Sequence, residues 1–461
     1  MLSVSGDFLT ATSAPVREWQ AELKFYFDGE GNPPVVFEDD RIVDFDLLEE
    51  SAEESRNPFG FVSSNELAMT LVNDDRVFTP TNTASPYYGK LKPNVKVEAE
   101  LKLKVDDDPV TWESVPLGTF WTGDWDAPSE NVHASVVGHD RLYSLGEKEL
   151  DLVRVQSDLT LYDMWVNLFS FLGLGPSDYE VDATLTQVIE IGWYPKGRVK
   201  EAMQQMAQGG ACYVYVDRNN KIRVVNARAS SASVVTLTDQ DQIMDIRVPQ
   251  KHQDMRSAVE VSFIRPTLGE SKEILRVDDI HLSSGTTTFE FEFSPGPVAL
   301  LEQVSLLRGT NVTIDEIHYG TWGCRLTVTA PESEGDPVEQ IISVSARGRV
   351  VDRGVESITQ VDALVEAEIG EEILHVDTNY IQNVEDATAF AVALLKLVSD
   401  PAPFVNVLIR GNPALELSDT VTIDDPTDKV PTVEGVIRRA TLRYSGGLEG
   451  ELSTIKRVLL T

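Results

Sequence analysis

One stretch of the sequence constrains the fold more than any other: in residues 95–105, apolar and charged residues alternate almost without a break. Successive side chains of a β-strand point to opposite faces, so this pattern places the apolar residues on one face of a strand. That face is formed by Val95, Val97, Ala99, Leu101, Leu103 and Val105. The other face carries Lys and Glu in mixed order, which is typical of a half-exposed antiparallel strand.

Further strand-like segments recur along the chain, with turn residues between them. They lie at residues 19–27, 66–72, 117–125, 131–140, 211–216, 221–225, 288–293, 324–329 and 341–346. Near the C-terminus, a strand ending at Ile409 is followed by Gly411-Asn412-Pro413 and an alternating segment up to Ile423, which we interpret as a tight turn between two strands. Many short strands separated by turns predict a mainly β fold, built as a sandwich or barrel.

Three segments instead have the apolar spacing of helices. Thr160-Leu161-Tyr162-Asp163 resembles a capping box with Asp in place of the usual Glu, and predicts a helix that runs to Gly173. A second helix is predicted from Val199, where Gly209-Gly210 would supply the left-handed residue at its C-terminus. A third begins after Asn383 and closes at Asp400-Pro401.

The length of the chain and these changes of character predict several domains. With 461 residues and a prior of about 150 residues per domain, roughly three are expected. The chain divides into a first β-barrel domain, a small α/β insertion, a β-rich region that starts a second barrel and holds an inserted β domain, and return strands with a helix that complete the second β domain. The predicted ranges of these parts are 1–150, 151–228, 229–355 and 356–461.

The formal net charge is −36, from 75 acidic and 39 basic residues. Such an acid excess argues against a groove that grips phosphate backbones, because affinity there comes from Lys and Arg displacing counterions. Two interpretations stay open. The acids either form a solvated surface, as in adaptation to high salt, or line a surface past which a polyanion moves without sticking.

Neither membrane insertion nor a disulfide scaffold is indicated. No window approaches 18 uninterrupted apolar residues, and the N-terminus has no basic segment followed by an apolar one, so we expect no membrane-spanning segment and no export. Cys212 and Cys324 lie far apart in the sequence and are interpreted as buried small hydrophobic residues.

The sequence contains only weak candidates for catalytic or metal-binding residues. The best pieces for a hydrolase or metal site are His139-Asp140 and Asp315-Glu316-Ile317-His318, yet a strand end or turn commonly carries such residues. Asp106-Asp107-Asp108 and Asp424-Asp425-Pro426-Thr427-Asp428 offer oxygen ligands for Ca²⁺ without the order of an EF-hand loop. We therefore predict no catalytic, cofactor-binding or metal-binding residue, no cofactor and no enzymatic activity.

Aromatic residues leave one more option. Exposed tryptophans can form a platform for sugars, although core packing is the commoner use in strand-like segments. The tryptophans considered for such a platform are Trp112, Trp121, Trp125, Trp193 and Trp322.

Several segments, taken in order, resemble the tail hub family of tailed bacteriophages, the trimeric hub of the baseplate or tail tip. The segments that carry the resemblance are 64–73, 86–90, 117–121, 139–145, 159–163, the helix before Gly209-Gly210 with its hairpin, 379–383 and 411–419. The resemblance covers residues 19–445. It implies two barrel-like β domains in each chain, which would form a pseudo-sixfold ring as a homotrimer and match the hexameric tail.

The resemblance also implies location and partners. The protein would be a structural virion protein at the tail tip or baseplate, assembled in the host cytoplasm. It would contact distal tail or baseplate proteins and the tape measure protein, and DNA would pass through its channel without specific binding. Because the chain stops at Thr461, soon after its last strands, we expect any spike or fibre to be a separate polypeptide.

Two other classes of function remain as alternatives. A secreted or surface carbohydrate-binding β-protein would account for the strands and the tryptophans, but it predicts an export signal. A hydrolase of the tail tip predicts a His/acid cluster. The sequence displays neither feature.

Overall fold

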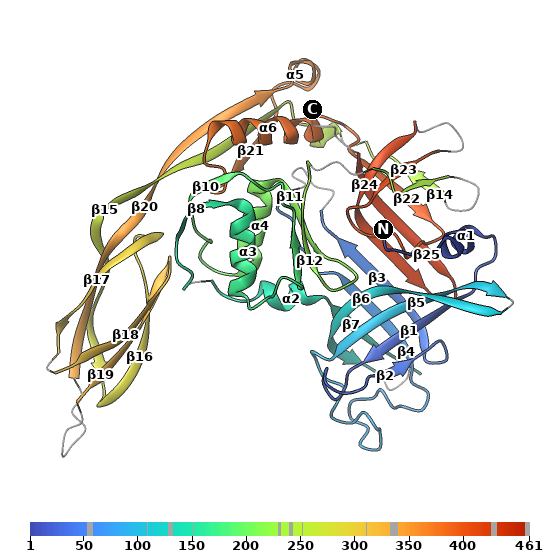
Figure 1. Ribbon diagram of the computed structural model, residues 1–461, viewed down its shortest axis with the longest axis horizontal. Coiled ribbons are helices and arrows are strands. Elements are labelled where there is room, and N and C mark those ends of the chain that lie inside the picture. Colours follow the sequence, from blue (N-terminus) through green and yellow to red (C-terminus); the bar gives the residue numbers. More distant parts are fainter. Residues whose placement is uncertain are drawn as a thin grey trace.

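The computed structural model describes residues 1–52, 59–107, 109–127, 132–150, 152–228, 232–238, 243–250, 252–309, 311–331, 340–425 and 431–456. Three regions stand side by side in Figure 1: a large sheet, a small α/β unit in the middle, and a long arm of paired strands. The fold is mainly β with several sheets and an α/β insertion, which confirms the predicted fold class.

The large sheet joins the two ends of the sequence. Its first β module consists of β1 (Trp19–Phe25), β2 (Val35–Phe37), β3 (Ile42–Glu50), β4 (Glu66–Val72), β5 (Lys96–Asp107), β6 (Val110–Asp126) and β7 (His133–His139). Its second β module consists of β13 (Val235–Leu237), β14 (Ile243–Arg247), β22 (Phe404–Ile409), β23 (Thr420–Ile423), β24 (Val433–Tyr444) and β25 (Leu448–Lys456). The modules meet where β3 pairs with β24, with Leu47 opposite Leu442.

Each module has its own core, and the sheet that the two modules share is open. Phe25, Leu101 and Phe120 belong to the core of the first module, whereas Val405 and Ile437 belong to that of the second. Among the strands of the described residues, the path of the sheet runs from β14 at one edge to β2 at the other. The two β domains therefore curve around separate cores without closing into complete barrels.

The α/β unit lies between the large sheet and the arm (Figure 1). It contains α2 (Arg141–Gly146), β8 (Gln156–Thr160), α3 (Leu161–Phe171), β9 (Tyr179–Val181), β10 (Val188–Gly192), α4 (Val199–Gly210), β11 (Cys212–Val216) and β12 (Ile222–Asn226). The predicted capping box is confirmed: the Asp163 N–H donates to Thr160 Oγ1 at 3.1 Å, and the Thr160 N–H donates to Asp163 Oδ2 at 2.9 Å. The predicted hairpin is confirmed as β11 and β12.

The end of α4 differs from the prediction. Gly209 and Gly210 are the last residues of the helix, and the left-handed residue is Ala211, with φ 48°. The glycines serve close packing instead. A Cβ on Gly209 would lie 2.6 Å from Thr378 Oγ1, and one on Gly210 would lie 2.4 Å from a Leu161 methyl group.

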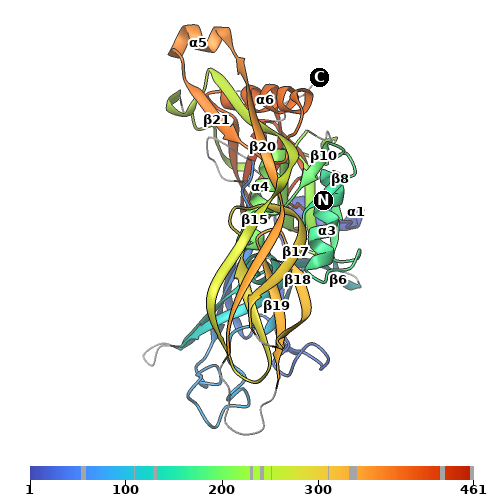
Figure 2. The ribbon, with the colours of Figure 1, turned by 90° about the vertical axis from the view of Figure 1, so that its left-hand side faces the viewer.

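The arm is a long ribbon of mainly antiparallel strands, and Figure 2 shows it face-on with its long axis vertical. Its strands are β15 (Ala258–Leu282), β20 (Gln340–Val361), β17 (Val298–Arg308), β21 (Ile373–Asp377), and a second sheet of β16 (Gly285–Glu292), β18 (Thr313–Tyr319) and β19 (Gly323–Ala330). The segments predicted at 324–329 and 341–346 are confirmed as parts of β19 and β20, and the segment predicted at 288–293 lies in β16 up to Glu292. Register shifts, such as the one between Leu268 and Ser271, interrupt the alternation along β15.

The remaining helices are short or lie at the root of the arm. They are α1 (Gly6–Ser13), the 3-10 turn η1 (His252–Asp254), α5 (Ala363–Ile369), which follows β20 at the end of the arm opposite β16, β18 and β19 (Figure 1), and α6 (Val384–Val398), which Asn383 caps as predicted. Within the described ranges, none of the helices has the length and apolar character needed to cross a membrane.

The segment at 407–423 does not form the predicted tight turn between paired strands. β22 pairs with β14 and β25, whereas β23 pairs with β13 and β24. The residues between them form a loop in which Leu415 and Leu417 are buried in the core of the second module. Their alternation therefore reflects the packing of a loop, and Gly411, with φ 83°, begins it.

Candidate assembly face

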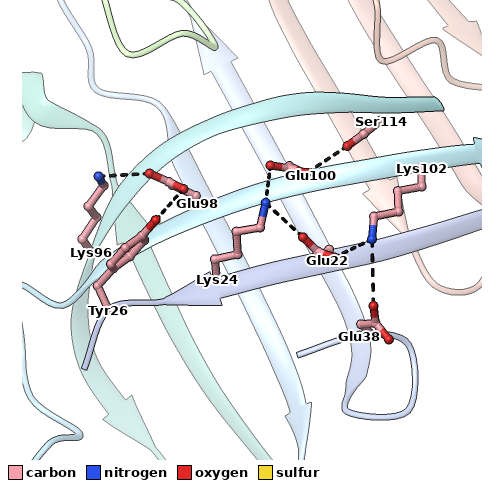
Figure 3. A network of polar contacts seen from close by, with 9 residues as sticks. All are labelled: Glu22, Lys24, Tyr26, Glu38, Lys96, Glu98, Glu100, Lys102 and Ser114. Carbon is pink, nitrogen blue, oxygen red and sulfur yellow. Dashed lines mark hydrogen bonds and ion pairs between the residues drawn. The ribbon is translucent and has the colours of Figure 1, made fainter. Parts of the chain in front are cut away.

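A row of charged side chains covers the outward face of β1 and β5 (Figure 3). We call Glu18, Glu22, Lys24, Lys96, Glu98, Glu100, Lys102 and Lys104 the charged ladder. The alternation noted in the sequence produces it, because Val97, Leu101 and Leu103 point into the core from the other side of β5. In the strand register Glu22 stands opposite Glu100, and Lys24 stands opposite Glu98.

Each lysine of the ladder lies between two carboxylates. Lys24 Nζ is 2.5 Å from Glu100 Oε1 and 3.0 Å from Glu22 Oε1. Lys102 pairs with Glu22 and lies 3.9 Å from Glu38. The same arrangement is found for Lys96 with Glu98 and Glu30, and for Lys104 with Glu18 and Asp107.

Glu22 and Lys24 of the ladder are held in their charged forms and are partly shielded from water. Burial acts to raise the pKa of Glu22, but hydrogen bonds from Lys102 and Lys24 outweigh it and leave that pKa below its ordinary value. For Lys24, burial acts to lower the pKa, and hydrogen bonds to Glu100 and Glu22 raise it above the ordinary value. The exposed fraction is 24% for the Lys24 side chain and 11% for that of Glu22. The face therefore carries charges that are held in fixed positions.

A second charged feature joins the α/β unit to both β modules. Arg218, in the turn between β11 and β12, binds Glu49 of β3 through two hydrogen bonds of 3.0 and 2.7 Å. The exposed fractions of these side chains are 1% and 3%. Arg218 Nη1 also donates to the carbonyl of Pro413, in the loop that follows β22. One guanidinium thus holds three parts of the chain together.

His139 and Asp140 occupy structural positions. The His139 ring stacks on Tyr143 with 4.4 Å between ring centroids. The Asp140 carboxylate accepts hydrogen bonds of 2.8 Å from the N–H groups of Asn65 and Leu142, and thereby caps α2. Burial raises the pKa of Asp140 to about 7. Its oxygens are engaged by backbone groups, so the pair does not form the nucleophile and base of a hydrolase.

The other acidic candidates lie apart from one another. His318 Nε2 lies 2.7 Å from Glu316 Oε1 on β18 in the arm. Asp107 pairs with Lys104 at the end of β5, and Asp424 accepts a hydrogen bond from Thr432. Asp108 and residues 426–428 lie outside the described residues. The described residues contain no group of three or more His, Cys, Asp or Glu side chains arranged to hold a metal ion.

The tryptophans do not form a common platform. Trp125 packs against Phe78 and Phe25 in the first module, at 5.7 and 5.8 Å between ring centroids. Trp193 is buried, and Trp322 Nε1 donates to the carbonyl of Tyr194 at 2.9 Å. Core packing therefore accounts for these three. Cys212 and Cys324 are buried in two different cores, as interpreted from the sequence.

The sequence patterns described above predict neither the charged ladder nor the Arg218–Glu49 pair. The ladder could have been anticipated, because the polar face of residues 95–105 and that of residues 19–27 both carry Lys and Glu. The buried pair could not, since its partners lie 169 residues apart.

Comparison with known proteins gives a match at the level of the fold. Neither a protein-family model nor a curated protein sequence matches this chain. Among solved structures, the 43 kDa tail protein of prophage MuSo2 from Shewanella oneidensis aligns with a TM-score of 0.54 and 12% identity, over 96% of this chain and all of that one. The tail protein from Neisseria meningitidis MC58 aligns with a TM-score of 0.52 and 10% identity, over 95% and 96% of the two chains. This chain therefore has the fold of phage tail proteins, as the order of the family-like segments along its sequence indicates.

Proposed function

We propose that the chain is a structural protein of a phage virion, the trimeric hub at the tail tip or baseplate. The observation that carries this proposal is the extent of the shared fold, which spans 96% of this chain and 100% of the Shewanella oneidensis tail protein. Assembly in the host cytoplasm follows from the same proposal.

The arrangement of the β modules supports a ring. Each chain holds two modules, so three chains would present six and could match a hexameric tail. Contacts in a cyclic trimer are heterologous, which means that two different surfaces of each chain meet. The ring would surround a channel for the tape measure protein and later DNA, and it would contact distal tail proteins and a separate spike or fibre.

The charge pattern supports passage of DNA without binding. Three chains together would carry three times the formal charge of −36. Lys24, Lys96 and Lys102 are each held by carboxylates, so their ammonium groups are not free to pair with phosphate. The ladder itself holds equal numbers of lysines and glutamates, so the repulsion would come from the net charge of the chain, and the paired lysines would not hold back a polyanion that slides past.

The oligomeric state of the purified chain tests the hub. We expect a mass of three times 51.0 kDa by light scattering and a ring with an axial hole by electron microscopy. A chain that stays monomeric over a wide range of concentrations and salt would contradict the proposal.

Retention of DNA tests the repelling surface separately. The wild-type chain should retain duplex DNA only at background level at low salt. Glu22→Gln with Glu100→Gln removes the partners of Lys24 and should raise retention. The control is Glu366→Gln with Glu368→Gln on α5, which makes the same change in net charge away from the ladder. Tight binding by the wild type would refute this part of the proposal.

A further inference from the structure

A polar cavity of about 280 Å³ lies between the α/β unit and the second β module. Tyr215 and Arg223 line it from β11 and β12, Arg438 lines it from β24, and the loop before β23 adds further groups. Those of the loop are Glu416, Leu417, Ser418 and Asp419. The cavity is far larger than the space one water needs, which is about 10–15 Å³ on this measure.

Arg438 is a buried cation without an acidic partner. The exposed fraction of Arg438 is 6%, and its guanidinium carbon lies 3.4 Å from the centroid of the Tyr213 ring. Nη1 donates to Ser418 Oγ at 3.1 Å, while Nε has no hydrogen-bond partner. In the part of the chain that the structure describes, no carboxylate lies within ion-pair distance of it. Burial lowers the pKa of Arg438, as expected for a charge that lacks compensation.

The acids of the cavity are engaged elsewhere. Asp217 lies 3.6 Å from Arg223 and accepts a hydrogen bond from the Lys221 N–H. Asp419 accepts from the Met1 ammonium group and from the Glu416 N–H. Burial raises the pKa of Glu416, which favours its neutral form. The acidic side chains of the cavity therefore do not neutralise the positive charge of Arg438.

We propose that this cavity binds a small monocarboxylate, with Arg438 as the group that recognises it. Arg438 is one of the residues that line the cavity, and a guanidinium forms charge-assisted hydrogen bonds with carboxylate oxygens. Asp217 and Asp419 disfavour a doubly charged phosphate, because they also line the cavity and repel negative charge within it. A ligand with one negative charge compensates Arg438 with the least repulsion from these acids. This proposal is independent of the role in a phage tail.

Acetate is the probe for a direct test on the full chain. Thermal unfolding is followed while acetate replaces chloride at constant ionic strength, and isothermal titration measures the affinity. We expect a saturable rise in Tm with acetate and a smaller one with phosphate. Arg438→Met should weaken acetate binding about tenfold or more, since a hydrogen bond to a charged group is lost. Arg443→Met, an exposed arginine on the same strand, is the matched control and should bind as the wild type does.

Two outcomes would overturn the carboxylate site. One is an Arg438→Met chain that responds to acetate as the wild type does. The other is a wild-type chain that shows no saturable binding, or one that phosphate stabilises more than acetate. This second outcome needs no variant, so the test remains decisive if Arg438→Met fails to fold.

Discussion

At the scale of single residues, the Arg218 side chain connects the α/β unit to both β modules. It lies in the turn of the β11–β12 hairpin, and it bonds to Glu49 in the first β module and to the Pro413 carbonyl in the second. A buried ion pair adds little net stability relative to apolar residues, but removal of one partner leaves the other charge buried and uncompensated. The pair thus makes the docking of the three parts specific.

Replacement of Arg218 should therefore be costly. Arg218→Met leaves Glu49 buried without its partner, and we expect the free energy of unfolding to fall by about 3–5 kcal/mol. Urea unfolding measures this change. Arg218→Met combined with Glu49→Leu should recover much of the loss. Arg443→Met, which breaks an exposed pair of 3.4 Å with Asp46, should change stability by at most about 0.5 kcal/mol. Equal effects of the two single variants would contradict this account.

Asp140 gives the residue-scale prediction for pH. Burial raises its folded-state pKa from 3.8 to about 7, so the folded chain binds this proton more tightly than the unfolded chain does. The resulting stability is fully present below pH 3.8 and is lost as the pH rises to about 7.

Urea unfolding between pH 4 and pH 8 measures this loss. Relative to Asp140→Asn, the wild type should lose up to about 4 kcal/mol over that range. The control is Asp124→Asn, an exposed position on β6, whose curve should run parallel to that of the wild type. A constant difference between wild type and Asp140→Asn at every pH would show that the aspartate acts as a cap alone.

At the scale of elements, β1 and β5 carry the charged ladder. A lysine of the ladder that pairs with two carboxylates should contribute more to the stability of the fold than a lysine in a single exposed pair. Lys24→Met leaves Glu22 and Glu100 facing each other, and we expect a loss of about 1 kcal/mol at low salt that shrinks as salt screens the repulsion. The matched control is Lys90→Met, which breaks an exposed contact of 2.8 Å with Asp28. Its effect should be at most about 0.5 kcal/mol. A loss at Lys24 that does not depend on salt would argue against the electrostatic origin.

Elements with local signals could be predicted from the sequence, and those fixed by distant contacts could not. The Thr160–Asp163 capping box and the alternation of β5 depend on residues close in sequence. The roles of Gly209 and Gly210 depend on Thr378 and Leu161, which no local pattern connects to them.

Distant contacts also fix the loop before β23 and the cavity beside Arg438. Leu415 and Leu417 alternate with polar residues as in a strand, but they do so because a loop buries both of them in the core of the second module. The cavity beside Arg438 combines three distant segments, so no motif marks it. The division of the chain into four ranges stays a prediction.

At the scale of the whole molecule, the net charge should govern association. Chains of −36 repel one another, and the repulsion is long-ranged at low salt, where the Debye length is about 30 Å at 0.01 M against about 3 Å at 1 M. We expect the trimeric fraction, measured by light scattering at fixed protein concentration, to rise with salt over this range. A trimer that dissociates as salt is added would show that ion pairs between chains, rather than apolar contacts, hold the ring together.

The pairing of β3 with β24 also has a consequence during synthesis of the chain. β3 ends at Glu50 and its neighbour begins at Val433, so one edge of the first module has no partner until nearly the whole polypeptide has left the ribosome. At usual translation rates this interval lasts on the order of 20–80 s. An uncovered strand edge pairs readily with other chains. Nascent chains emerging together would therefore be exposed to mispairing at β3, and a chaperone that shields this edge would raise the yield of folded protein.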